Sequence, residues 1–186
     1  MKKLIFLFIF ICTLLSPVFA ENYRQIYKDL QMPDFAYLHG IDPKHFFENK
    51  DASYSVYPLF RLSAPLYFKN IIIKPGYYDL TPREHEGKDY ILFKQNGLVV
   101  HILPVYKKEV VPAGFYKSHL PKEKRALTQK IGDGFHSFIG KCFKSAKRHR
   151  LAKTYLEVND VSDNFVELVV YCDDFKYYIL TRTVKL

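Results

Sequence analysis

Histidine and acidic side chains are the first residues in this sequence that could bind a metal ion or transfer protons. The chain has seven histidines, but no two are four residues apart, the spacing that presents two imidazoles on one helix face. The densest group of ligand types is Glu84, His85 and Glu86, beside Gly87 and between two expected strands. An exposed polar loop explains this group, and His101 is interpreted as a surface or half-buried strand residue. No metal site and no cofactor are predicted.

The candidate nucleophiles lack the sequence surroundings that activate such residues. Cys142 has lysines nearby, which favour the reactive thiolate, but no glycine-flanked nucleophile segment surrounds it. No serine stands in a G-x-S-x-G segment, and the chain has no phosphate-binding glycine loop or dinucleotide fingerprint. Asp160 and Asp163 lack the glycine and distal glutamate of an EF-hand. Catalysis is therefore not predicted, and the alternative is an envelope hydrolase whose site is assembled from separated histidine and acidic residues.

One segment of the chain concentrates positive charge. Residues 121–150 hold nine basic residues against two acidic ones, a net charge of +7. The whole chain carries +9, of which Lys2 and Lys3 belong to an N-terminal leader. Removal of the leader leaves a net charge of +7, which equals the charge of residues 121–150. The rest of the mature chain is therefore formally neutral. A field of one sign attracts polymers that bear phosphate or carboxylate groups.

The basic segment has the pattern of a cationic amphipathic helix. Its apolar residues fall within about 160° of a helical wheel, although Gly132-Asp133-Gly134 can break the helix into two. The basic residues of the opposite face are Lys130, Lys141, Lys144, Lys147 and Arg148. We expect this face to contact an anionic envelope partner, namely a lipid headgroup, a polysaccharide or an acidic protein. The structural alternative is the solvated side of a helix that packs on a sheet.

The N-terminus has the layout of a cleavable secretory signal. Two lysines precede the apolar run 4–15, and Val18 and Ala20 are the small residues that a signal peptidase accepts before its cut. A membrane anchor would need roughly 20 apolar residues, which is longer than this run. Cleavage after Ala20 leaves residues 21–186 as a single domain that is exported to the periplasm or the extracellular space. Export makes nucleic acid a less expected partner than the envelope, and no later stretch could span a membrane.

The mature chain starts with helix signals and continues with strand signals. Residues 21–31 have apolar side chains at helical spacing, and Asp42 before Pro43 resembles the N-cap of another short helix. From residue 52 the pattern changes to short apolar runs broken by proline and glycine. Within this part, Lys74-Pro75-Gly76-Tyr77 fits a type II turn, because glycine supplies the positive φ of the third position.

Two hairpins are predicted with specific registers. Residues 90–103 turn at Asn96-Gly97, which places Phe93 opposite Val100 and Leu92 opposite His101. The C-terminal hairpin turns at Asp173-Asp174 and places Cys172 opposite Phe175, Val170 opposite Tyr177 and Leu168 opposite Ile179. Residues 152–158 supply a further strand. These elements predict an α+β fold, in which an antiparallel sheet of hairpins carries short N-terminal helices and the basic amphipathic helix packed on one sheet face.

A disulfide between Cys142 and Cys172 is predicted, because these are the two cysteines that remain after leader cleavage of an exported chain. Both lie on apolar faces of their expected elements, and two buried thiols are the alternative. The bond should stabilise the protein by about 3 to 4 kcal/mol through closure of the long loop. Alkylation of the exported protein, denatured without reductant, should leave both thiols unmodified. Modification of either thiol in that sample would contradict the bond.

Overall fold

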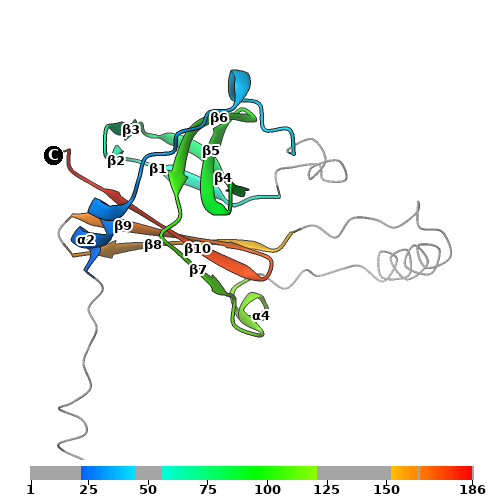
Figure 1. The fold of residues 1–186 in the computed structure, drawn as a ribbon. Coiled ribbons are helices and arrows are strands. Elements are labelled where there is room, and N and C mark those ends of the chain that lie inside the picture. The colour runs from blue at the N-terminus through cyan, green and yellow to red at the C-terminus, as the bar shows by residue number, and fades with distance from the viewer. Residues whose placement is uncertain (1–21, 45–55, 121–151, 163, 186) are drawn as a thin grey trace, which may run out of the picture.

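Two antiparallel β-sheets form the protein (Figure 1). The structure is a computed structural model and describes residues 22–44, 56–120, 152–162 and 164–185. One sheet has four strands in the order β1-β4-β5-β6. The other has six, in the order β3-β2-β10-β9-β8, with β7 also paired to β10. The chain moves between the sheets more than once, because β2 and β3 separate β1 from β4 and because β7 follows β6.

The four-stranded sheet is a meander with one added edge strand. Two-residue turns join β4 to β5 and β5 to β6, since positive φ angles occur at Glu86 and Gly87 and again at Asn96 and Gly97. Glycine and asparagine tolerate this left-handed backbone, which matches the twist of a hairpin. The strands are β1 (Leu59–Leu62), β4 (Gly76–His85), β5 (Lys88–Gln95) and β6 (Leu98–Pro104).

The six-stranded sheet is built around β10. One edge of β10 pairs along its length with β9, and the other edge is shared by β7 at its start and β2 at its end. Val105 and Tyr106 carry the chain from one sheet to the other, because the Val105 N–H donates to Asp89 O and the Tyr106 N–H donates to Tyr178 O. The strands are β2 (Leu66–Phe68), β3 (Ile71–Ile73), β7 (Lys107–Val110), β8 (Thr154–Val161), β9 (Phe165–Cys172) and β10 (Phe175–Arg182).

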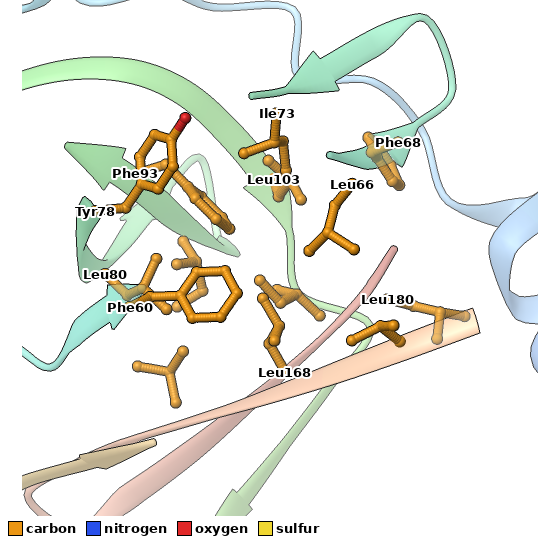
Figure 2. Packing of buried hydrophobic residues seen from close by; sticks show 14 of the residues in the cluster. Phe60, Leu66, Phe68, Ile73, Tyr78, Leu80, Phe93, Leu103, Leu168 and Leu180 are labelled. Atoms are coloured by element: carbon orange, nitrogen blue, oxygen red, sulfur yellow. The ribbon is translucent and has the colours of Figure 1, made fainter. Parts of the chain in front are cut away.

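The core lies between the two sheets, where apolar side chains from both layers meet (Figure 2). Alternate residues of a strand point to the same face, so β4 and β5 direct Leu80 and Phe93 inward while β9 directs Leu168 inward. These three side chains are fully buried. Burial of one such side chain contributes about 1.5 to 3 kcal/mol, and this is the main source of cohesion between the layers.

Short helices pack against the two sheets. Helix α2 (Tyr23–Asp29) starts at Asn22, whose side chain accepts a hydrogen bond from the Gln25 N–H, and it buries Tyr27 against Phe68 and Phe165. The helix predicted for residues 21–31 is therefore confirmed. A 3-10 turn, η1 (Leu38–Gly40), follows it. Helix α4 (Phe115–His119) stacks Phe115 on Tyr171 of β9 with 4.3 Å between ring centroids.

The predicted α+β class is wrong, and the protein is more nearly all-β. Within the described ranges the α-helices are α2 and α4, of seven and five residues, and the apolar face of each sheet packs on the other sheet. The sheets thus cover one another where a helix was expected to pack. The residues of the expected basic helix lie outside the described ranges. No helix in the described part of the chain is long and apolar enough to cross a bilayer.

The C-terminal hairpin is confirmed in its register, and the central hairpin is confirmed only in its turn. Cys172 pairs with Phe175 and Leu168 with Ile179, as predicted. In the central hairpin, a bulge between Phe93 and Lys94 shifts the register, so that Phe93 pairs with His101 in place of Val100. The bulge inserts one residue into β6 and thereby exchanges the faces of the residues that follow it.

The turn predicted at Lys74-Pro75-Gly76-Tyr77 is also wrong in type. A type II turn needs a positive φ at Gly76, and Gly76 is absent from the described residues with positive φ. A Cβ atom at this position would lie 2.8 Å from the side-chain nitrogen of Gln95, which is the far end of a flexible side chain. Residue 76 therefore begins β4 with a close approach to β5.

Residues 33–42 form a strap across the outer face of the four-stranded sheet. Phe35 and Tyr37 pack on a second apolar cluster of Tyr90, Leu92 and Ile102. The strap then makes a single β-bridge to β6, between residues 41 and 98. The strap covers apolar side chains on the face of this sheet that points away from the core.

The strap ends at a buried carboxylate that holds two cations. Asp42 Oδ2 accepts hydrogen bonds from Arg83 Nη2 at 2.7 Å and Lys94 Nζ at 2.6 Å, and Asp42 and Lys94 are 2% and 1% exposed. Asp42 Oδ1 accepts the Lys44 N–H, a local bond of the type expected from an N-cap. The ring and hydroxyl of Tyr57 also lie against Arg83. This carboxylate ties the strap to β4 and β5.

Replacing Asp42 with asparagine should destabilise the protein by about 3 to 5 kcal/mol, because Arg83 and Lys94 would stay buried without this carboxylate. Chemical denaturation measures the change. Asp160→Asn, an exposed change on β8, is the matched control and should stay within about 0.5 kcal/mol. Equal stability of the two variants would show that the carboxylate does not anchor the strap.

The difference in stability between the wild type and Asp42→Asn should depend on pH. Burial alone would raise the pKa of Asp42, but hydrogen bonds and charge from Arg83 and Lys94 lower it below its ordinary value. A carboxyl with a lowered folded-state pKa stabilises the protein above its unfolded pKa of about 3.9, and this stability is lost as the pH falls through the folded pKa. The stability difference between wild type and Asp42→Asn should therefore shrink in the acid range.

Candidate functional site

The predicted anionic-partner site lies outside the described residues. This applies to Lys130, Lys141, Lys144, Lys147 and Arg148, and also to Cys142. Its disulfide partner, Cys172, is half-buried at the end of β9, where it pairs with Phe175 and Thr154. The alternation of β9 places Cys172 in the same row as Val170 and Leu168, as the sequence indicated. The basic face and the disulfide both stay predictions.

The group of Glu84, His85 and Glu86 occupies a hairpin end. Glu86 and Gly87 are the two turn residues between β4 and β5, and the His85 ring stacks on Phe35 at 3.9 Å between centroids. The described residues contain no group of three or more histidine, cysteine, aspartate or glutamate side chains that could hold a metal ion. Glu84 and His85 belong to β4, and His85 is half-buried, so the exposed loop expected from the sequence is confined to Glu86 and Gly87.

His101 belongs to a different environment from His85. The bulge turns it toward the face of Phe93 and Tyr78, and burial lowers its pKa. It lines a cavity of about 310 Å³ under the strap, which is otherwise apolar and contains no acidic side chain among its described lining residues. This cavity therefore lacks the combination of histidine and carboxylate on which the hydrolase alternative depends.

Tyrosine and glutamate side chains form a polar network on β8, β9 and the chain before β7. Glu167 is buried, and its carboxylate accepts hydrogen bonds from the Tyr106 hydroxyl and, at 3.1 Å, from Asn159 Nδ2. Tyr171 donates to Glu157 at 2.9 Å. Burial and this bonded carboxylate raise the pKa of Tyr171, so its hydroxyl stays protonated. These bonds satisfy polar groups that the sheet takes out of water.

Glu109 of β7 is the centre of a second network, on β10. It accepts hydrogen bonds from Lys176 at 2.7 Å and from the Tyr178 hydroxyl at 2.8 Å, and Lys107 lies 3.1 Å from its other oxygen. The hydrogen bond from Lys176, followed by those from Tyr178 and Lys107, lowers the pKa of Glu109 to about 2. A carboxyl held in its charged form in this way is a poor general acid or base at neutral pH.

The largest of the described cavities lies where the chain passes between the sheets. It has a volume of about 540 Å³ and is bounded by the end of α2, residues 30–34, the start of β5 and residues 104–108. Tyr90 and Pro104, which pair across β5 and β6, are both buried at this cavity. Three aspartates and three lysines line it: Asp29, Asp34, Asp89, Lys88, Lys107 and Lys108.

No pattern in the sequence indicates this cavity. Its lining comes from three separate stretches of the chain, each of ordinary composition and none with a motif. The backbone N–H groups of Val105 and Tyr106 bond to different sheets. This role can be recognised only when the pairing of both sheets is known.

Comparisons with known proteins add no assignment. No protein-family model, no curated protein and no solved structure matches this chain. The charges, cavities and buried networks of the chain itself therefore carry the functional argument.

Replacement of Lys176 with methionine should raise the pKa of Glu109 from about 2 toward the ordinary glutamate value of about 4.3. The substitution removes the strongest donor to this carboxylate. Carbon-13 NMR of the Glu109 side-chain carboxyl through an acid titration measures the pKa directly. Lys74→Met removes an exposed lysine outside the network and should leave the titration unchanged. A midpoint near 4 in the wild type would refute the assigned network.

Proposed function

We propose that this protein is an exported binding protein that contacts an anionic component of the cell envelope through its basic segment, residues 121–150. The observation that carries the proposal is the distribution of charge. The segment has nine basic residues against two acidic ones, whereas the described ranges have sixteen against thirteen. Such a concentration produces a local positive field that attracts anionic surfaces and polymers.

The ion pairs in the described part of the chain support this proposal. Lys94 and Arg83 bind the buried Asp42, Lys176 and Lys107 bind Glu109, and Lys108 binds Asp89. Five of the sixteen basic residues in the described ranges are therefore engaged in these pairs. The excess positive charge belongs to the basic segment.

Export supports the choice of partner. A leader of the kind found at residues 1–20 directs the chain to the envelope or beyond, where lipid headgroups and acidic polysaccharides supply fixed negative charge. Binding by charge needs no shaped pocket and no catalytic group. The hydrolase alternative receives no support from the cavity that contains His101, as described above.

A charge-removal experiment tests the proposal. Changing Lys141, Lys144, Lys147 and Arg148 to glutamine should weaken binding to phosphatidylglycerol vesicles or to a heparin column by at least about tenfold, since each basic residue near an anionic surface contributes about 1 kcal/mol. Cosedimentation and the salt concentration of elution are the measurements. Wild-type binding should also fall steeply with salt, because the Debye length shrinks from about 10 Å at 0.1 M to about 3 Å at 1 M.

A matched variant separates location from total charge. Lys28, Lys44, Lys74 and Lys117 are exposed lysines of the described framework, and their change to glutamine removes the same four charges. This control should retain most of the binding, and both variants should keep the wild-type melting temperature. Equal binding by wild type and the basic-segment variant would leave that segment as a solvated surface. Equal losses in both variants would mean that only net charge matters.

A further inference from the structure

The cavity between the two sheets contains opposite charges that are not paired with each other. Asp34 and Lys88 both line it, and neither makes an ion pair with another described residue. The other charged groups there are engaged, since Lys108 Nζ lies 3.0 Å from Asp89, Lys107 binds Glu109, and Gln25 donates to Asp29 at 2.8 Å. One carboxylate and one ammonium group thus remain for a ligand.

A buried phenol adds a third ligand-binding group. Tyr90 is only 6% exposed, lines this cavity and makes no hydrogen bond to any described residue. Its hydroxyl is not one of the described polar atoms that are sealed from solvent without a partner, so it keeps some access to solvent. Burial, followed by the charges of Asp34 and Glu86, raises the pKa of Tyr90. The phenol therefore stays protonated and can both donate and accept a hydrogen bond.

Size and lining restrict the class of ligand. A volume of about 540 Å³ lies within the range of roughly 300 to 1,000 Å³ that holds drug-sized ligands. Leu30, Met32 and Val105 add apolar surface to the lining. A ligand that matches this lining carries an ammonium group and a carboxylate at its two ends and neutral or apolar groups between them.

We propose that this cavity binds a short peptide with free termini, with its ammonium group at Asp34 and Tyr90 and its carboxylate at Lys88. Asp29, which lines the same cavity at the end of α2, adds a further negative charge. The inference rests on groups in the described framework and does not depend on the basic segment. The two binding functions can therefore be tested separately.

Isothermal titration calorimetry with trialanine as the probe tests the proposal. The unmodified peptide should bind, whereas N-acetylated trialanine and trialanine amide should each bind about tenfold or more weakly, because each cap removes one charge-assisted contact. Tyr90→Phe, which deletes only the hydroxyl, should weaken binding of the unmodified peptide about two- to tenfold. Thermal unfolding checks that every variant is folded.

Paired changes assign each terminus to its partner. Asp34→Asn should weaken binding of trialanine, and N-acetylation should cause little further loss in this variant because the contact is already absent. Lys88→Gln should show the same relation to amidation of the carboxyl end. The controls Asp160→Asn and Lys74→Gln change exposed charges outside the cavity and should bind trialanine as the wild type does.

The outcomes distinguish this proposal from the proposed envelope function. The basic-segment variant should bind trialanine normally, and Asp34→Asn should bind anionic vesicles normally. Absence of trialanine binding at millimolar concentration would overturn the peptide site and leave the envelope proposal untouched. Binding that is indifferent to both caps, or to both Asp34→Asn and Lys88→Gln, would also overturn it.

Discussion

Exclusion of water between two apolar sheet faces is the interaction on which the rest of this structure depends. Neither sheet is self-sufficient, because each presents a row of buried apolar side chains on one face that must be covered. Leu80 and Phe93 on one side and Leu168 on the other satisfy this requirement together (Figure 2). The strap, the short helices and the corner between β6 and β7 pack around this contact.

Burial of polar groups follows as a second constraint. Covering the outer faces of the sheets removes Asp42, Lys94 and Glu167 from water, and a charged group in such a place needs hydrogen-bonding partners. The structure supplies them from distant parts of the chain, as in the contact of Asp42 with Arg83 and that of Tyr106 with Glu167. These networks lower or raise pKa values for structural reasons. Arg83 and Lys94 lower the pKa of Asp42 and keep its carboxylate charged and hydrogen-bonded, a poor state for proton transfer.

The corner between the sheets has a different character, because its charged groups are incompletely paired. Val105 and Tyr106 satisfy their backbone groups on opposite sheets, so the chain cannot close the space between α2 and the start of β5. Asp34, Lys88 and Tyr90 line that space. The molecule thus combines a framework in which five cations are paired with carboxylates, a cavity lined by charged residues, and a basic segment for which we propose binding.

The sequence by itself determined the local features of this protein. The turn at Asn96-Gly97, the complete register of the C-terminal hairpin and the helix near residues 21–31 depend on backbone preferences and side-chain alternation within a few residues. The charge of residues 121–150 is equally a property of the sequence alone. These features need no knowledge of what lies across the fold.

Only the tertiary structure decided the fold class, the central register and the cavity. Alternation shows that a strand has an apolar face, but a helix or a second sheet can cover that face equally well, and here a sheet does. Because of the bulge beside Phe93, β6 packs apolar side chains both on the core and on the strap. The local sequence pattern does not predict this bulge. Asp42 resembled a simple helix cap because its cations, Arg83 and Lys94, are 41 and 52 residues away in the chain. Long-range packing brings such groups together, and their separation along the chain leaves no periodic trace in the sequence.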